Sequence, residues 1–396
     1  MEFVEEIKIR SYDVLIDRAK VEDLQRRCEV GPKEHVLLYT DTMGDPICRI
    51  RNSPIYNMLV AELNNNEIVG LIQGSIKLVR LHKQSKVGYI LGLRVSPLHR
   101  RKGIGSMLVN HLEQWFVSNN VDLSYMATEK DNEASINLFI NKHGYIKFRS
   151  PSILVHPGNN RLNKPSSNIE IMKLDVCQAE FLYRKFMGLA EFFPQDIDKI
   201  LRNRLSVGTW VAYYKNDGSL LDFDGGDDKF FGLDNGIIIP KSWAMLSVWN
   251  SGELFRLRVG KAPFSCLCYA KSSKIIHKVM PCFDVPKLPE FDDPFGFYFM
   301  YGVHKQGPSS GKLVTTLCRF VHNLATQSQD FNKVVVTEVI GGCDQLKPHL
   351  IPHLNFLSCS EDWWCIKAMK KEEVKTVYEL GNTSPTRALF VDPREV

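Results

Sequence analysis

The chain has 396 residues, of which 44% are hydrophobic and 24% charged, so it has the composition of a globular protein and the length for two domains. The net charge of +5 is too small to indicate direct binding of nucleic acid. Its 10 cysteines lack paired spacing, which predicts free thiols in a reducing compartment and no metal site. The acidic N-terminus has no secretory segment, and the longest apolar run, Phe295–Val303, is too short for a membrane span, so we expect an intracellular protein without a membrane anchor.

The first half of the chain predicts a mixed central sheet flanked by helices, an α/β (α+β) fold. Apolar alternation and buried runs predict strands over residues 7–10, 56–63, 68–79, 87–95 and 122–128. Helical spacing of apolar residues predicts helices before Gly31, over 104–116 and over 134–142. Strands over 145–149 and 152–156 are expected to close the sheet, so that residues 1–157 form a complete domain.

The loop between the strand 87–95 and the helix 104–116 predicts a cradle for an anion. Arg100, Arg101 and Lys102 place three positive charges directly before Gly103-Ile104-Gly105. The glycines remove the Cβ atoms that would keep a ligand away from the backbone. The first-turn N–H groups of the helix have no intrahelical partners, and the helix dipole adds positive charge there. This combination suits a pyrophosphate.

The pattern Arg-x-x-Gly-x-Gly, here Arg100–Gly105, resembles the acetyl-CoA signature of the GNAT superfamily of N-acetyltransferases. The segment Asn132–Phe139, followed by Gly144-Tyr145, resembles a second GNAT segment, in which the Asn commonly holds the pantetheine arm. The resemblance implies a GNAT fold and acetyl-CoA as a substrate. The acetyl-CoA contacts that it implies are Leu93, Arg94 and Val95 on the strand, Arg100, Arg101, Lys102, Gly103, Ile104, Gly105 and Ser106 in the cradle, and Asn132, Ser135 and Phe139 on the following helix.

The second GNAT segment of this chain departs from the family pattern in two ways. Phe139 stands where the family often has the Tyr that supplies a proton to the CoA thiolate, so this position has no hydroxyl. One more residue than is common in the family separates Phe139 from Gly144, so the end of this helix is expected to be displaced.

The general base is not where some relatives carry it. On the central strand this chain has Leu91 and Gly92, and neither can accept a proton. Glu129, at the end of the strand 122–128, is therefore our candidate for the catalytic base, with Glu62 on an earlier strand as an alternative. The alternative for Glu129 is a purely structural network with Asp131 and Asn132 that caps the next helix.

The second half repeats the pattern in a weakened form. Residues 158–168 are predicted to form a linker, 169–370 a degenerate second copy of the fold, and 371–396 a C-terminal tail. Gly311 follows Val303 at the spacing at which Gly103 follows Val95, but Pro308 replaces Arg100 and Leu313 replaces Gly105. We therefore expect a broken second cradle, and we expect Trp363–Ala368 to close the second sheet.

One rival motif lies in the same place. Gly307–Gly311 matches Gly-x-Ser-x-Gly, the nucleophile elbow of serine hydrolases, with His349 and His353 downstream. An elbow requires the strand to run directly into the turn, whereas His304–Gln306 is expected to intervene, and too few strands follow to complete a hydrolase sheet. The hydrolase interpretation is therefore disfavoured.

Longer segments resemble the plant Hookless-type N-acetyltransferases over nearly the whole chain. They include Arg27–Gly31, Gly44–Arg51, Leu91–Pro97, Glu191–Pro194, Ser242-Trp243, Leu246–Trp249 and Phe390–Arg394. The resemblance implies an acyltransferase of the nucleus or cytoplasm that acetylates a protein or small amine in hormone-controlled differential growth, within ethylene and auxin signalling, with histones or other nuclear proteins as suspected acceptors. The missing hydroxyl and strand carboxylate leave a second possibility, a weak or inactive regulator that senses CoA and acts through protein binding.

Overall fold

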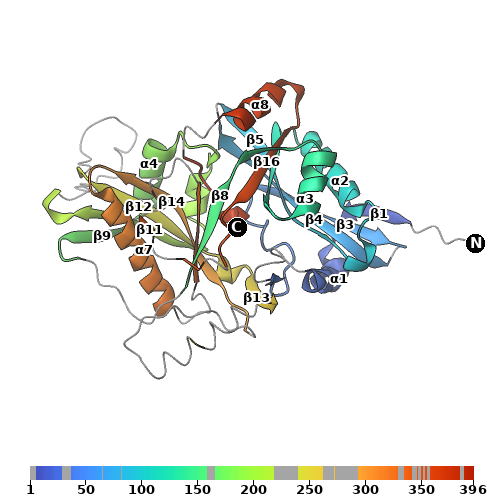
Figure 1. The fold of residues 1–396 in the computed structure, drawn as a ribbon, viewed down its shortest axis with the longest axis horizontal. Helices are drawn as coiled ribbons and strands as arrows, with labels where there is room; N and C mark the ends of the chain where they lie inside the picture. The colour runs from blue at the N-terminus through green and yellow to red at the C-terminus, as the bar shows by residue number, and fades with distance from the viewer. Residues whose placement is uncertain are drawn as a thin grey trace, which may run out of the picture.

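The computed structural model describes residues 6–28, 37–64, 66–81, 83–157, 166–217, 240–261, 272, 293–328, 334–340, 346, 349–350, 353–354, 357–383 and 388–396. The predicted linker and the Ser384–Arg387 part of the predicted tail lie largely or wholly outside these residues. Two sheets lie side by side, with the C-terminus between them and the N-terminus at the far end of the first half (Figure 1).

The first sheet contains most of the strands of the N-terminal half. Its order is β1 (Ile7–Ser11), β3 (Ile55–Leu63), β4 (Glu67–Arg80), β5 (Gln84–Val95), β6 (Leu123–Glu129), β16 (Asp362–Ala368) and β7 (Ile146–Arg149), with the short β10 (Phe193–Pro194) paired to β4. The β5–β6 pair is parallel, and the other pairs are antiparallel. The predicted strands of this half are confirmed within one to a few residues at each end.

The second sheet repeats this arrangement. Its order is β9 (Ile169–Leu174), β11 (Ser206–Tyr214), β12 (Trp243–Asn250), β14 (Phe297–Gln306), β15 (Val334–Ile340) and β8 (Pro151–Pro157), and β14–β15 is its parallel pair. The order of these six strands corresponds one to one to β1, β3, β4, β5, β6 and β16 of the first sheet. The predicted second copy of the fold is therefore confirmed. A small ribbon of β2 (Leu37–Asp41) and β13 (Arg256–Lys261) pairs the two halves.

The halves exchange one strand each. Only Ser150 separates β7 from β8, yet β8 pairs with β15 of the second sheet. Conversely, β16 inserts between β6 and β7 of the first sheet. The predictions that 152–156 closes the first sheet and 363–368 the second are therefore wrong, because an alternating pattern identifies a strand but not its neighbour. Residues 1–157 do not complete their own sheet.

A long helix packs on the outer face of each sheet. α2 (Ile104–Ser118) buries Ile104, Leu108, Leu112 and Phe116 against the first sheet, each at most 1% exposed, as their spacing predicted. α7 (Ser310–Gln327) does the same for the second sheet. The other helices are α1 (Val14–Arg27), α3 (Glu133–Ile136), a π-helical continuation of α3 called η2 (Asn137–Lys142), α4 (Val176–Met187), α5 (Ile197–Leu201) and α8 (Val374–Asn382). No described helix is long and apolar enough to span a membrane.

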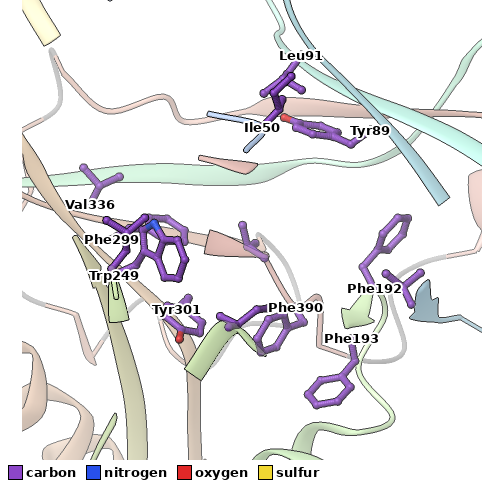
Figure 2. Packing of buried hydrophobic residues seen from close by; sticks show 14 of the residues in the cluster. Ile50, Tyr89, Leu91, Phe192, Phe193, Trp249, Phe299, Tyr301, Val336 and Phe390 are labelled. Atoms are coloured by element: carbon purple, nitrogen blue, oxygen red, sulfur yellow. The ribbon is translucent and has the colours of Figure 1, made fainter. Parts of the chain in front are cut away.

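The largest core lies between the two sheets and belongs to both. Figure 2 shows side chains of this cluster, among them Tyr89 and Leu91 from β5, Trp249 from β12 and Phe299 from β14. Phe390 from the C-terminal segment joins the same cluster and is 1% exposed. The expected tail is therefore wrong for the described residues, since 374–382 form α8 and 388–396 are mostly buried.

Ion pairs fix this C-terminal segment between the halves. Lys77 of β4 lies 2.7 Å from a carboxylate oxygen of Glu395 and 3.2 Å from one of Asp392. Arg394 pairs with Asp392 at 2.7 Å and with Asp196 at 2.8 Å. Burial alone would raise the pKa of Asp392, but the charges of Arg394 and Lys77 hold it well below its usual range. A buried network of this kind is strongly destabilising to break.

The strand exchange predicts that residues 1–157 cannot fold alone. Without β16, the edges of β6 and β7 lose their partner, and without the second sheet the inner face of the first is exposed to water. We expect this fragment to give no cooperative thermal unfolding transition by circular dichroism, and co-expression with residues 158–396 to restore one. A cooperative transition from the fragment alone would contradict the exchange.

Candidate active site

The predicted cradle is an open, positively charged turn at the start of α2. After β5 the chain makes one 3₁₀ turn over Pro97–His99, and Arg101 (φ 68°) and Gly103 (φ 82°) then adopt left-handed backbone on either side of Lys102. Such alternation turns successive N–H groups toward a common side, a geometry that binds anions. Gly103 is the N-cap of α2, so no side chain caps the first-turn N–H groups. No atom lies within 4 Å of the position that a Cβ of Gly103 would take. Arg100, Arg101 and Lys102 are exposed around this space.

The corresponding turn of the second half is filled. Gly307 (φ 88°) and Ser309 (φ 64°) repeat the left-handed backbone, but a Cβ at Gly311 would lie 2.2 Å from the ring of His349. Thr315 donates a hydrogen bond to the His349 carbonyl oxygen at 2.7 Å and so holds that residue in place. A broad, open hollow of about 850 Å³ lies in front of this turn. The left-handed residues and the helix starts show that Ser309 corresponds to Gly103 and Gly311 to Gly105, so our alignment of Gly311 with Gly103 and of Leu313 with Gly105 is wrong by two residues. The ring of His349 lies against the glycine that corresponds to Gly105. This supports the expectation of a broken second cradle.

The hydrolase motif has no hydrolase geometry. β14 runs through Gln306 directly into Gly307, so our argument that residues intervene between strand and turn is wrong. Ser309 nevertheless adopts an ordinary left-handed backbone (φ 64°, ψ 5°) as the N-cap of α7. Within the described residues its carbonyl oxygen accepts a hydrogen bond from Tyr214 at 3.1 Å, and its hydroxyl has no imidazole partner.

The strand that leads into the first cradle has an open edge. β5 pairs with β6 only as far as Ile90 opposite Met126, although β5 continues to Val95 and β6 to Glu129. Beyond Ile90 the backbone groups of β5 that face β6 are therefore unpaired in this ladder. They can accept the hydrogen bonds of an extended amide chain such as pantetheine.

A bulge at Gly92 decides which face each side chain takes. Leu91 lies opposite Gln73 and Arg94 opposite Leu71, so β5 carries one residue more than β4 in this interval, and Gly92 has φ 63°. Leu93 and Val95 consequently pack on the outer face with α2, whereas Leu91 belongs to the core between the sheets. The alternation places the Arg94 side chain on the inner face. The predicted acetyl-CoA contacts on this strand thus use its backbone, and the Arg94 guanidinium faces the opposite side.

The helix after β6 packs beside the start of α2. Asn132 caps α3 by accepting a hydrogen bond from the Ser135 N–H at 3.2 Å. The extra residue before Gly144 falls in a π-helix over Asn137–Lys142, whose wider turn accommodates it. The expected displacement of the helix end stays a prediction. Phe139 is 2% exposed and meets Tyr145 edge-on with ring centres 5.4 Å apart, which places it in the core.

Two further contacts join α2 to this helix. Leu138 lies 3.5 Å from the Cβ position of Gly105. The Ser106 hydroxyl is 2.9 Å from Nε2 of His143, a buried ring whose pKa is lowered by its burial. The Ser106 side chain therefore fixes the end of the π-helix, and its backbone belongs to the first turn of α2.

Glu129 lies on the inner face among other buried carboxylates. It stands opposite Asp362 in the β6–β16 ladder. Burial and, to a smaller extent, the charges of Asp362 and Asp131 raise the pKa of Glu129 to about 7. Burial also raises the pKa of Asp362 to about 6. A carboxyl with this pKa can accept a proton near neutral pH.

The structure weakens both alternatives to Glu129 as the base, which are a purely structural role in capping the next helix and Glu62 as the base instead. The helix cap after β6 is made by Asn132, not by Glu129. Glu62 is held by Arg10, with 2.7 Å between Nε and Oε2, and that hydrogen bond lowers its pKa. Sequence reasoning missed Asp362 and also Glu338, whose Oε1 accepts a hydrogen bond from Trp364 Nε1 at 3.1 Å. Both come from the C-terminal half, so no local spacing could connect them with Glu129.

Comparisons with known proteins agree with this geometry. Residues 19–145 match the acetyltransferase (GNAT) family. The probable N-acetyltransferase HLS1 of Arabidopsis thaliana is 43% identical over 98% of this chain and 99% of its own length. The acetyl transferase GW6a of Oryza sativa subsp. japonica is 31% identical over 98% of this chain and 97% of its own length.

Solved structures share the two-copy fold at low sequence identity. N-myristoyltransferase of Saccharomyces cerevisiae with bound myristoyl-CoA gives a TM-score of 0.55 at 9% identity, covering 93% of this chain and 80% of that chain. A tandem GNAT protein from the clavulanic acid biosynthesis pathway gives a TM-score of 0.51 at 9% identity, covering 92% of this chain and 99% of that chain. On the strength of the full-length relatives, the chain belongs to the HLS1-type N-acetyltransferases of the GNAT family, for which acetyl-CoA is the acyl donor.

Proposed function

We propose that this protein transfers the acetyl group of acetyl-CoA to the nitrogen of an amine, with Arg100–Gly105 and the open edge of β5 holding the donor. The observation that carries the proposal is the empty space above Gly103, between three exposed cations and the start of α2. Backbone N–H groups of Arg101–Gly105 bind the pyrophosphate, and the β5 edge at Leu93–Val95 binds the pantetheine.

Glu129 acts as the general base in this proposal. The amine loses a proton to the Glu129 carboxylate, its nitrogen attacks the thioester carbonyl, and the C–S bond breaks to release the thiolate. Phe139 offers no proton, and none is required, because a thiol has a pKa of about 8.5 and its thiolate can leave and take a proton from water. The inner-face position of Glu129 puts the acceptor between the two halves, opposite α2.

The biological setting follows the relatives. Similarity to HLS1 over 98% of the chain supports a role in hormone-controlled differential growth in a plant, within ethylene and auxin signalling, in the nucleus or cytoplasm. The acceptor is then a small amine or a protein, with histones and other nuclear proteins as the protein candidates. A catalytically weak regulator that senses CoA is the second proposal, favoured by the buried Phe139 in place of a hydroxyl group.

Substituting Gly105→Glu is expected to abolish acetyl-CoA binding, with a loss of affinity of about 100-fold or more. The new side chain starts 3.5 Å from Leu138 and 3.8 Å from Val95, so its carboxylate fills the cradle and repels phosphate. Calorimetric titration measures the loss, with Lys312→Glu in the second half as the matched control that keeps wild-type affinity. Wild-type affinity in Gly105→Glu would place the donor elsewhere.

Glu129→Gln is expected to lower the acetylation rate by about 100-fold or more without changing acetyl-CoA affinity. Because the base must be ionised, the wild-type rate should rise with pH through about 7 and then level off, and the variant should lack this inflection. Thiol release from acetyl-CoA with core histones or small amines as acceptors measures both. Glu133→Gln, an exposed neighbour, is the control.

Two results separate the proposals. An unchanged rate in Glu129→Gln would remove this residue from catalysis. Acetyl-CoA binding with no acetylation of any acceptor would favour the regulator that senses CoA.

A further inference from the structure

A small polar cavity lies on the inner face of β5 at the Gly92 bulge. It has a volume of about 10 Å³ and is lined by Gln25, Thr40, Arg49, Gln73, Gly92 and Arg94. These residues come from α1, β2, the turns after β2, β4 and β5. A space of this size holds about one water-sized atom, so a ligand would enter it with a single oxygen.

Two guanidinium groups meet here without a counter-charge. Neither Arg49 nor Arg94 forms an ion pair with a residue that the structure describes, and the Arg49 guanidinium lies 5.2 Å from the ring centre of Phe255. Burial and, to a smaller extent, the charge of Arg49 lower the pKa of Arg94 to about 10. Both residues are half-buried, whereas the fully buried Arg149 and Arg394 are paired with Glu191 and Asp392. The uncompensated pair therefore calls for an anion from outside the chain.

Unpaired hydrogen-bond acceptors lie beside these cations. Gln73 is 2% exposed, and its amide nitrogen donates to the Pro46 carbonyl oxygen at 2.8 Å, which fixes the side chain. Its Oε1 lies 3.4 Å from the Cβ position of Gly92 and has no hydrogen-bond partner among the described residues. A second acceptor, Gln25 Oε1, and one donor, Arg49 Nε, also lack a partner among them. Buried polar atoms are normally paired, so this set suits a ligand with both an anion and an N–H donor.

The position of the cavity relates it to the acceptor rather than to the donor. Leu93 and Val95 face α2, whereas Arg94 and Gly92 border the cavity on the inner face, which also carries Glu129. If the β5 edge holds the pantetheine, as proposed above, a ligand in the cavity lies across the strand from it.

We propose that Arg49 and Arg94 bind the carboxylate of the acceptor, and that the acceptor is a small amino acid whose amine lies near this carboxylate. This inference rests on the proposed acetyltransferase function. The planar fork of arginine matches a carboxylate with two parallel hydrogen bonds, and the small cavity favours a carboxylate over a phosphate. A lysine side chain of a histone has no carboxylate of its own and would leave both arginines unpaired.

The test compares the common amino acids with their amides, which differ only in the carboxylate. The amine of an amide is less basic and more often unprotonated, so a preference for the acid reports recognition and not reactivity. We expect the wild type to prefer an acid over its amide by about 10-fold or more in kcat/KM, because the amide lacks the charge that strengthens these hydrogen bonds. Arg49→Gln and Arg94→Gln should each remove this preference, and Arg49→Lys should restore part of it.

Controls keep the outcomes distinguishable. Arg51→Gln removes an exposed arginine that pairs with Asp45 at 2.6 Å and should leave the preference intact. The unfolding temperature with each amino acid measures binding without turnover, and calorimetry with acetyl-CoA tests the donor site separately. Failure to bind acetyl-CoA would reject the proposed function, while the unfolding temperature still decides on the cavity.

Three results would overturn the carboxylate site. The first is that the wild type acetylates no amino acid and that no amino acid raises its unfolding temperature. The second is a preference for acids that survives both arginine substitutions. The third is acetylation of histone lysines at a rate that neither substitution changes, which would assign the acceptor to a protein.

Discussion

The apolar core between the two sheets is the constraint on which the rest of the structure depends. Each sheet is apolar on both faces, and a long helix packs on the outer one. The inner faces are buried against each other together with α1, α4, α5 and the C-terminal segment, so residues of both halves form one cluster. Exchange of β8 and β16 and the buried ion pairs of Lys77 then lock the halves together.

This arrangement explains why two copies of one fold supply different parts of the proposed site. The first copy keeps a turn with free space above Gly103, whereas in the corresponding turn of the second the ring of His349 lies against Gly311. The second copy instead contributes β16, which puts Asp362 beside Glu129, and β15, which brings Glu338 near Trp364. The low-polarity space between the sheets raises the pKa of Glu129 to about 7 and so prepares it to accept a proton.

Local features could be predicted from the sequence, and contacts between distant segments could not. The strand before the cradle and the helix from Ile104 could be predicted from apolar periodicity and from two glycines. The conformation of such a segment depends mainly on residues that are close in the sequence. The exchange of β8 and β16 leaves no local trace, since either strand has the alternation that either sheet needs. Arg49 lies in irregular turns without periodicity, and only the fold brings it to Arg94. The sequence shows the extra residue before Gly144, but it does not show that the backbone accommodates this residue in a π-helix.

Amide hydrogen exchange of the full-length chain with and without acetyl-CoA tests the central claim most directly, which is that one donor site lies in the first copy only. The account predicts slowed exchange over residues 93–106, where β5 and the first turn of α2 would bind the donor, and no change over 307–313. Protection of 307–313, or none over 93–106, would contradict it.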